Sequence, residues 1–167
     1  LPFMATSCCP AWSVMAKKLF PEHAKCISMA LTPMTLTARL IKQHNPDARV
    51  VFIGPCAAKK LEAMRRSVRS EVDFVLTFEE MTGIFSAKHV ALENIEEDPA
   101  GVSDASTDGR NFAVAGGVAC PGGCVVGAGT MQAIKKSQTS VGLYAKQSTH
   151  KTSSETEYIK ELDKLVD

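Results

Sequence analysis

The sequence predicts an α/β fold in which a mainly parallel sheet is flanked by helices. Short runs of β-branched and aromatic residues alternate along the chain with segments of helical periodicity, which is the pattern of strands joined by crossover helices. The length of 167 residues lies within the ~100–200 residues of a typical domain. We therefore expect a single domain over residues 1–167, with ligand-binding loops at the carboxyl ends of its strands.

The first third of the chain predicts two helices and a strand. Pro10 suits the first turn of a helix over residues 10–20, because its missing N–H is not needed there. A second helix begins at a Thr-Pro pair and covers residues 32–44. The apolar run over residues 49–53 is typical of a strand that is buried on both faces, and it ends at Gly54.

The middle of the chain predicts a second strand and a third helix. Residues 73–77 form another short apolar run, which predicts a second buried strand. Thr77 and Glu80 then form a capping-box pattern that starts a helix over residues 78–85. Residues 86–109 are acidic and polar, which predicts a loop.

The last third of the chain predicts one more strand and a final helix. The third strand covers residues 111–115 and leads into a glycine-rich segment that ends at Gly129. Ser154 and Glu157 form another capping-box pattern, followed by a helix striped with apolar residues on one face.

Charge and composition exclude several classes of protein. The net charge of +1 argues against a nucleic-acid-binding protein, which needs clustered cations to displace counterions. No run approaches the ~18 apolar residues of a membrane span, so we expect no membrane partner. The first five residues lack the basic start of a signal peptide, so we expect a cytoplasmic location. A start at Leu1 indicates a fragment or a piece of a larger unit.

Five of the six cysteines lie in turns or glycine-rich segments at the ends of predicted strands: Cys8, Cys9, Cys56, Cys120 and Cys124. Four thiolates from three loops are the usual ligands of a 4Fe–4S cluster, since thiolate is a soft ligand. Small residues between and after the last two cysteines let the backbone approach a bound group closely. A zinc site is the alternative, although its cysteines are usually closer in sequence. Cys26 lies among apolar residues and is expected to be a small buried side chain.

Three segments resemble, in the same order, the signature motifs of the iron-only (FeFe) hydrogenase catalytic domain. They are Thr6-Ser7-Cys8-Cys9-Pro10-x-Trp12, Pro55-Cys56-x-x-Lys59-x-x-Glu62, and Ala119-Cys120-x-Gly122-Gly123-Cys124-x-x-Gly127-x-Gly129. The similarity continues between the motifs and covers most of the chain up to about Thr130.

The resemblance implies a specific cofactor. In the family, a 4Fe–4S cubane is bridged by one cysteine to a diiron unit with CO, cyanide and dithiolate ligands, together called the H-cluster. The positions of the motifs imply Cys9, Cys56, Cys120 and Cys124 as cubane ligands, with Cys124 as the bridge. Cys8 is then the free thiol that shuttles a proton, a role that suits a group whose ordinary pKa is about 8.5.

The resemblance also implies roles for three further side chains. Lys59 points its ammonium at a cyanide ligand, Glu62 matches a proton-relay glutamate, and Ser28 lies where a relay hydroxyl is expected. The alternative for Lys59 and Glu62 is a solvated surface with no function. The loop residues that the resemblance places around the cofactor are Gly54, Pro55, Val118, Gly122 and Gly123.

Two of these positions differ from catalytic members of the family. Gly54 and Val118 stand where catalytic members carry methionine, and loss of those side chains is expected to loosen the pocket beside the diiron unit. The chain is therefore similar to the sensory branch. It is also shorter than a full catalytic domain, and it has no ferredoxin-like cysteine module.

The resulting hypothesis is an oxidoreductase that interconverts protons plus electrons with dihydrogen at an H-cluster, in an anaerobic cytoplasm. Its implied partners are a ferredoxin or redox subunit as electron donor, maturation enzymes, and a covering subunit or second copy. One alternative is a hydrogen or redox sensor with little turnover. Another is an iron–sulfur cluster assembly relative without the diiron unit, against which the presence of Cys8 and Lys59 argues.

Overall fold

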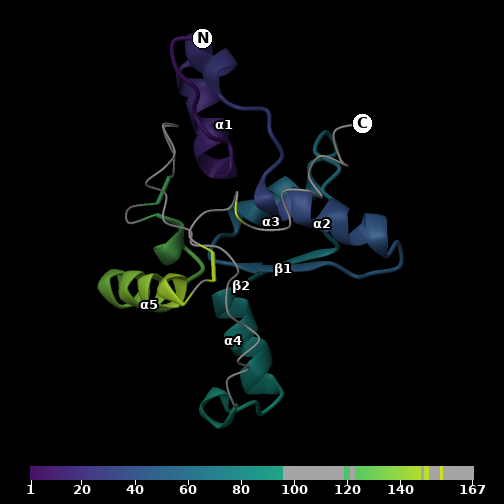
Figure 1. Cartoon of the computed structure of the whole chain (residues 1–167), viewed down its shortest axis with the longest axis vertical. Coiled ribbons are helices and arrows are strands. Elements are labelled where there is room, and N and C mark those ends of the chain that lie inside the picture. The colour runs from purple at the N-terminus through teal and green to yellow at the C-terminus, as the bar shows by residue number, and fades with distance from the viewer. Residues whose placement is uncertain (96–118, 121–122, 148, 151–154, 156–167) are drawn as a thin grey trace. The chain divides into compact units, whose positions relative to one another are not determined.

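The computed structural model describes residues 1–95, 119–120, 123–147, 149–150 and 155 (Figure 1). The chain forms two compact units. The first unit comprises residues 1–90 and 113–132, and the second comprises residues 91–112 and 133–167. Every predicted site residue that the structure describes belongs to the first unit.

The first unit contains most of the secondary structure. Its α-helices and strands are α1 (Pro10–Leu19), α2 (Pro33–His44), β1 (Val51–Gly54), α3 (Ala58–Met64), β2 (Phe74–Thr77) and α4 (Phe78–Ala87). Two 3-10 helices, η1 (Pro21–Cys26) and η5 (Cys124–Val126), complete the described part of this unit. The second unit contains η2 (Leu92–Asn94) and α5 (Ile134–Lys146). No described helix has the length and apolar character needed to cross a membrane.

The parallel sheet is confirmed by a βαβ unit. Strands β1 and β2 pair in parallel, with Val51 opposite Phe74 and Gly54 opposite Thr77. A parallel pair needs a long crossover, and α3 lies in that crossover. Helix α3 packs against β2, and α4 contacts both strands. The α/β fold class is therefore confirmed.

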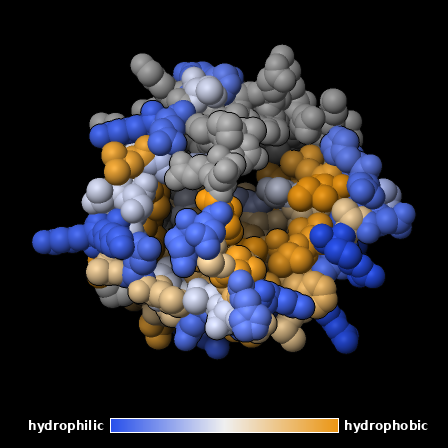
Figure 2. Space-filling view, turned by 90° about the horizontal axis from the view of Figure 1, so that it is seen from below, coloured by the Kyte–Doolittle hydropathy of each residue, from blue (hydrophilic) through white to orange (hydrophobic). Residues whose placement is uncertain are grey.

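The predicted burial of the two strands on both faces is wrong. Val51 is 46% exposed, Ile53 is 44% exposed and Phe74 is 61% exposed. Side chains alternate along a strand and match across the pair, so these three residues share one face of the sheet. This face is therefore partly open to solvent, and apolar residues at the surface are orange in Figure 2.

Helix starts follow the capping signals. Thr77 and Glu80 form the predicted capping box of α4, with the Glu80 N–H 3.2 Å from Thr77 Oγ1 and the Thr77 N–H 2.8 Å from Glu80 Oε2. Helices α1 and α2 begin with Pro10 and Pro33, as predicted. The first two residues of the predicted polar loop of residues 86–109 belong to the end of α4. The loop also contains η2, and from position 96 it lies outside the described residues. The strand predicted over 111–115 and the final helix, apart from Glu155, also lie outside the described residues.

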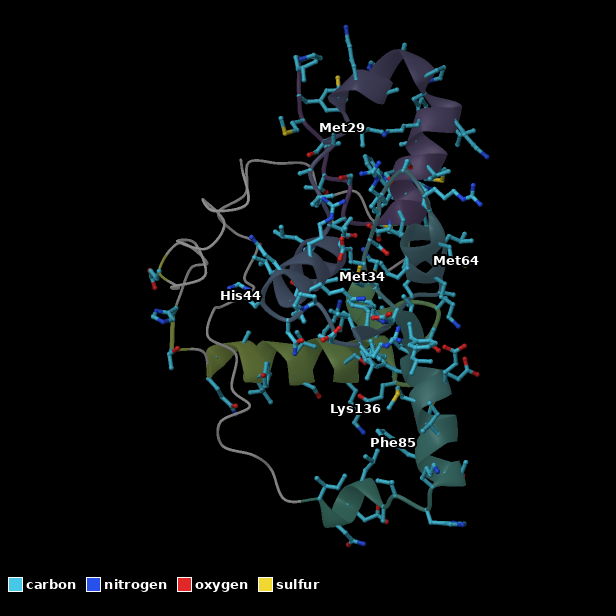
Figure 3. All side chains as sticks on the ribbon, turned by 90° about the vertical axis from the view of Figure 1, so that its right-hand side faces the viewer. Met29, Met34, His44, Met64, Phe85 and Lys136 are labelled. Carbon is cyan, nitrogen blue, oxygen red and sulfur yellow. The ribbon has the colours of Figure 1, made fainter. Side chains whose placement is uncertain are left out.

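The buried core of the first unit is made mainly of residues from its N-terminal segment, η1 and α2. Its apolar members are Ala5, Cys9, Cys26, Ile27, Met34 and Ala38. Met34 is 5% exposed, whereas Met29 and Met64, also labelled in Figure 3, lie at the surface. Cys26 is 1% exposed, so its predicted role as a small buried side chain is confirmed.

Asp73 ties the end of α2 to the start of both strands. Its carboxylate accepts a 2.8 Å hydrogen bond from the Val50 N–H, and it forms ion pairs with Lys42 at 3.0 Å and Arg49 at 3.1 Å. The Val50 hydrogen bond and then these cations lower the pKa of Asp73 from 3.8 to about 2. The folded state thus favours the ionised carboxylate.

We predict that Asp73→Asn lowers stability at neutral pH and removes part of its acid dependence. Because folding lowers the pKa of Asp73, its stabilising contribution is full above about pH 4 and is lost as the pH falls toward about 2. Urea unfolding at several pH values measures this. Asp47, which has no ion-pair partner among the described residues, supplies the control variant Asp47→Asn. An unchanged slope of stability against pH in Asp73→Asn contradicts the prediction.

Candidate functional site

The first cysteine pair lies in the loop that enters α1. Cys9 is the residue before the helix, and its Sγ accepts a 3.4 Å hydrogen bond from the Trp12 N–H. Cys9 is buried and Cys8 is exposed. The segment before the loop is held by a parallel bridge between Ala5 and Ile27. The loop thus presents two adjacent thiols in different environments.

The glycine-rich segment docks onto the carboxyl ends of both strands. The Gly129 N–H donates to the Pro55 carbonyl at 2.8 Å, and the Glu79 N–H donates to the Gly129 carbonyl at 3.1 Å. Pro55 and Cys56 follow β1, and Glu79 lies in the first turn of α4. These bonds bring the third motif to the loop that carries Cys56, as the prediction of loops at the carboxyl ends of strands requires.

Glycine is needed in this segment because of close packing. A Cβ at Gly127 would lie 2.5 Å from the Pro55 carbonyl oxygen, and one at Gly129 would lie 2.6 Å from Thr77 Cβ. Gly123 has φ 80°, a left-handed conformation that favours glycine. The first two glycines were expected to let the backbone approach a bound group, and here they let it approach the protein itself. Gly122 and Val118 lie outside the described residues.

Four of the motif cysteines lie close enough to the fifth, Cys124, to affect its ionisation. Partial desolvation raises the pKa of the Cys124 thiol even though the residue is exposed, and the other four cysteines raise it further: Cys9, Cys8, Cys120 and Cys56. Like charges disfavour ionisation, so this rise indicates that the four cysteines lie near Cys124. The fold therefore brings the cysteines of all three motifs together in the first unit.

The cysteines do not form a site for a single metal ion. In the described part of the chain, no three Cys, His, Asp or Glu side chains lie close enough to bind one ion together. A zinc site needs four ligands at about 2.0–2.3 Å from one centre. A 4Fe–4S cluster has four irons, each of which takes one thiolate, so its ligands are spread more widely.

Lys59 and Glu62 form a buried ion pair beside the Cys8 loop. The Lys59 ammonium lies 2.7 Å from Glu62 Oε2 and donates to the Cys8 carbonyl at 2.9 Å. Glu62 is 4% exposed, and its Oε1 accepts a 2.6 Å hydrogen bond from the Thr32 hydroxyl. Glu62 is therefore not on a solvated surface, and Lys59 is partly buried beside it. The neighbouring Lys60 pairs with Glu80 at a more exposed position.

Ser28 and Glu62 line one cavity. The cavity has a volume of about 250 Å³, and Ser7 and Thr32 also line it. Ser28 is half-buried, and its Oγ accepts a 3.1 Å hydrogen bond from the Ala30 N–H. The two side chains that the resemblance names as relay groups thus face the same space.

The space beside Gly54 is filled. Gly54 is buried, and a Cβ there would lie 2.5 Å from Cε1 of the Phe52 ring. A longer side chain at this position would require the Phe52 ring to move, and the expected loosening of the pocket beside the diiron unit stays a prediction.

A family profile described as "Iron only hydrogenase large subunit, C-terminal domain" matches residues 1–119. The chain belongs to this family. The match covers the first two motifs and ends just before Cys120, and it confirms the resemblance found in the sequence.

Individual relatives are also hydrogenases or proteins of iron–sulfur cluster assembly by name. Iron hydrogenase 1 of Clostridium pasteurianum is 32% identical over 133 residues, which are 70% of this chain and 23% of that protein. The cytosolic Fe-S cluster assembly factor NAR1 of Kluyveromyces lactis is 36% identical over 78 residues, which are 47% of this chain and 17% of that protein. The chain thus spans less than a quarter of the length of either relative.

A solved structure of the FeFe-hydrogenase HydA1 from Chlamydomonas reinhardtii, in a variant form, shares the fold. Its TM-score is 0.73 at 17% identity, over 98% of this chain and 71% of that chain. This likeness supports the α/β fold class.

One residue of the site was not predicted from the sequence. Thr32 was recognised only as part of a helix start, yet its hydroxyl bonds Glu62. Thr32 and Glu62 are separated by 30 residues, and no local pattern indicates such a contact.

We predict that Gly127→Ala destabilises the first unit by about 1–3 kcal/mol, because the added Cβ collides with the Pro55 carbonyl and strains the docked segment. Gly83→Ala is the matched control. Gly83 lies inside α4 with nothing within 4 Å of an added Cβ, so alanine there stabilises by about 0.5–1 kcal/mol. Urea unfolding followed by circular dichroism measures both. An equal free energy of unfolding for Gly127→Ala and the wild type would contradict the prediction.

Proposed function

We propose that the first unit holds a 4Fe–4S cluster through Cys9, Cys56, Cys120 and Cys124. The observation that carries the proposal is the docking of the third motif onto the loop of Cys56, through the 2.8 Å hydrogen bond from the Gly129 N–H to the Pro55 carbonyl. The raised pKa of Cys124, caused in part by the other four motif cysteines, agrees with this convergence. Thiolates that repel one another are stabilised when a positively charged metal group replaces their protons.

The donor set fits such a cluster. All four proposed ligands are soft thiolates from three loops. The loops of the second and third motifs dock onto each other at the strand ends, and Lys59 links the second motif to the Cys8 loop. Cys9 lies at the N-terminus of α1, where helix N–H groups favour negative charge.

We further propose that the cluster is the cubane part of an H-cluster, with the diiron unit attached through Cys124. When bound, this cofactor supplies the redox chemistry that interconverts protons plus electrons with dihydrogen. Cys8 is the thiol left outside the ligand set, and its exposure suits a group that takes up and releases a proton. The enzyme would then be a hydrogenase, which is the activity named for its relative from Clostridium pasteurianum.

The other site residues support this chemistry. Lys59 keeps a fixed positive charge beside the Cys8 loop, where an anionic cyanide ligand would need compensation. Glu62 and Ser28 hold and pass protons along the cavity that they line. Pro55 and Gly123, together with Gly54, Gly122 and Val118, shape the loops around the cofactor.

The proposed partners follow from this reaction. They are dihydrogen, protons, an electron donor such as ferredoxin or a redox subunit, maturation enzymes, and a covering subunit or second copy. We propose a cytoplasmic, anaerobic setting, which the name of the cytosolic relative supports. Another relative, from Nitratidesulfovibrio vulgaris, is named as a periplasmic hydrogenase large subunit and is 29% identical over 130 residues.

Two other functions have specific support. A role in iron–sulfur cluster assembly, without the diiron unit, is favoured by the 36% identity to the assembly factor. A sensor with slow turnover is favoured by glycine at position 54, where catalytic members carry methionine. The retained Cys8 and Lys59 favour the hydrogenase, because in the family they serve the diiron unit.

We predict that anaerobic reconstitution with iron and sulfide gives about four irons per chain and the absorption of a 4Fe–4S cluster. Cys56→Ser or Cys124→Ser lowers iron binding at least severalfold, because a ligand is lost. Cys26→Ala, which removes a buried cysteine outside the motifs, leaves the iron content unchanged and serves as the control. An iron content in Cys56→Ser equal to that of the wild type contradicts the proposed ligand set.

Maturation separates the three functions. After incubation with the maturation enzymes, infrared bands of metal-bound CO and cyanide are expected in the wild type and in Cys8→Ala. Hydrogen evolution with a low-potential dye is expected in the wild type and lost in Cys8→Ala, since proton transfer fails. Bands with negligible turnover would favour the sensor. A cubane without these bands, under conditions that mature a longer homologue, would favour the assembly relative.

A further inference from the structure

Thr32 is a buried hydroxyl whose bonding is not explained by helix formation. It precedes α2 and is 8% exposed, but its side chain makes no capping hydrogen bond to that helix. Its Oγ1 instead lies 2.6 Å from Glu62 Oε1 and 3.4 Å from Thr35 Oγ1. A carboxylate only accepts, so the single Thr32 proton goes to Glu62 and the Thr35 hydroxyl is left to donate to Thr32.

The bond from Thr32 continues to the Cys8 loop. One carboxylate oxygen of Glu62 accepts a hydrogen bond from the Thr32 hydroxyl, and the other accepts one from the Lys59 ammonium, so both oxygens have a donor. The Lys59 ammonium is shared between Glu62 and the Cys8 carbonyl. Four residues from the Cys8 loop, the start of α2, and α3 are thus joined by three bonds of 2.6 to 2.9 Å.

Burial makes this arrangement rigid. Glu62 is 4% exposed and Thr35 is fully buried, so the only water that could replace a missing partner of Glu62 is water in the cavity that Glu62 lines. A buried carboxylate that loses a donor must turn toward its remaining partners or be neutralised. Either change alters the hold of Glu62 on Lys59, and with it the bond from Lys59 to Cys8.

We propose that Thr32 is a positioning residue for Cys8, acting through Glu62 and Lys59. The Thr32 hydroxyl fixes the Glu62 carboxylate, which fixes the Lys59 ammonium against the Cys8 carbonyl. The importance of Cys8 as a proton carrier rests on the proposed function, but its positioning is a property of the metal-free chain. Thr32 is therefore the residue that links the start of α2 to the reactive thiol.

The test compares Thr32→Val, which has the same shape but no hydroxyl, with Thr32→Ser, which keeps the hydroxyl. The rate of alkylation of Cys8 by iodoacetamide is measured at fixed pH in the reduced, metal-free full chain. Peptide mass spectrometry separates Cys8 from Cys9, and Cys120 in the same sample is the internal reference.

We expect Thr32→Val to speed alkylation of Cys8 about fivefold relative to Cys120, the factor expected from loss of one hydrogen bond that restrains the loop. Thr32→Ser stays within about twofold of the wild type, since its hydroxyl can make the same bond. A Cys8 rate in folded Thr32→Val equal to that of the wild type overturns the proposal. If Thr32→Val does not fold, as judged by circular dichroism, Thr32→Ala takes its place in the comparison.

A double-mutant cycle tests whether the effect passes through Lys59. If the route is correct, Thr32→Val has no further effect once Lys59 is gone, so the double variant should alkylate Cys8 at the same rate as Lys59→Met alone. If the two substitutions change the alkylation rate independently, so that their separate factors multiply in the double variant, the proposed route from Thr32 through Lys59 is overturned. Since no metal is present, failure here leaves the cluster proposal intact, and failure of iron binding leaves the positioning of Cys8 intact.

Discussion

The hydrogen bond from the Gly129 N–H to the Pro55 carbonyl is the contact on which the site depends. It joins two loops that are more than seventy positions apart in the sequence, and it places the third motif beside the first strand. The bond from Glu79 to the Gly129 carbonyl fixes the other side of the same residue, so the segment spans the ends of both strands. Without this docking, the chain would keep its βαβ unit but would separate Cys120 and Cys124 from Cys56.

The elements that local signals specify are those that sequence reasoning located well. Helices α1, α2 and α4 start where Pro10, Pro33 and the Thr77 capping box predict, because these signals act within one helical turn. Helix α5 was not predicted, and neither was α3 as an element: both begin after alanine, without a side-chain cap. The strands were located, but their exposure depends on which other elements cover the sheet, which no local pattern of residues reports.

The residues of the site also differ in whether the sequence alone could identify them. The cysteines, Lys59 and Glu62 were identified because they belong to motifs, in which residue type and spacing carry the information. Thr32 belongs to no such motif, and its contact with Glu62 depends on how α2 and α3 pack. The glycines are intermediate: their presence indicates close approach, but only the structure shows that Gly127 approaches Pro55 and not a ligand.

Five neighbouring cysteines do not destabilise the metal-free chain by charge repulsion, because a protonated thiol is neutral. Partial desolvation and the neighbouring cysteines raise the pKa of Cys124, so this residue stays protonated at neutral pH and adds no repulsion. The docked segment, the Cys9 cap and the Lys59 bridge then hold the sulfur atoms in place without metal. Metal binding must displace those protons, so the proposed cluster would bind more tightly as the pH rises. The polar contacts around the site thus have a structural role, because they hold the loops that carry the cysteine sulfurs before metal binds.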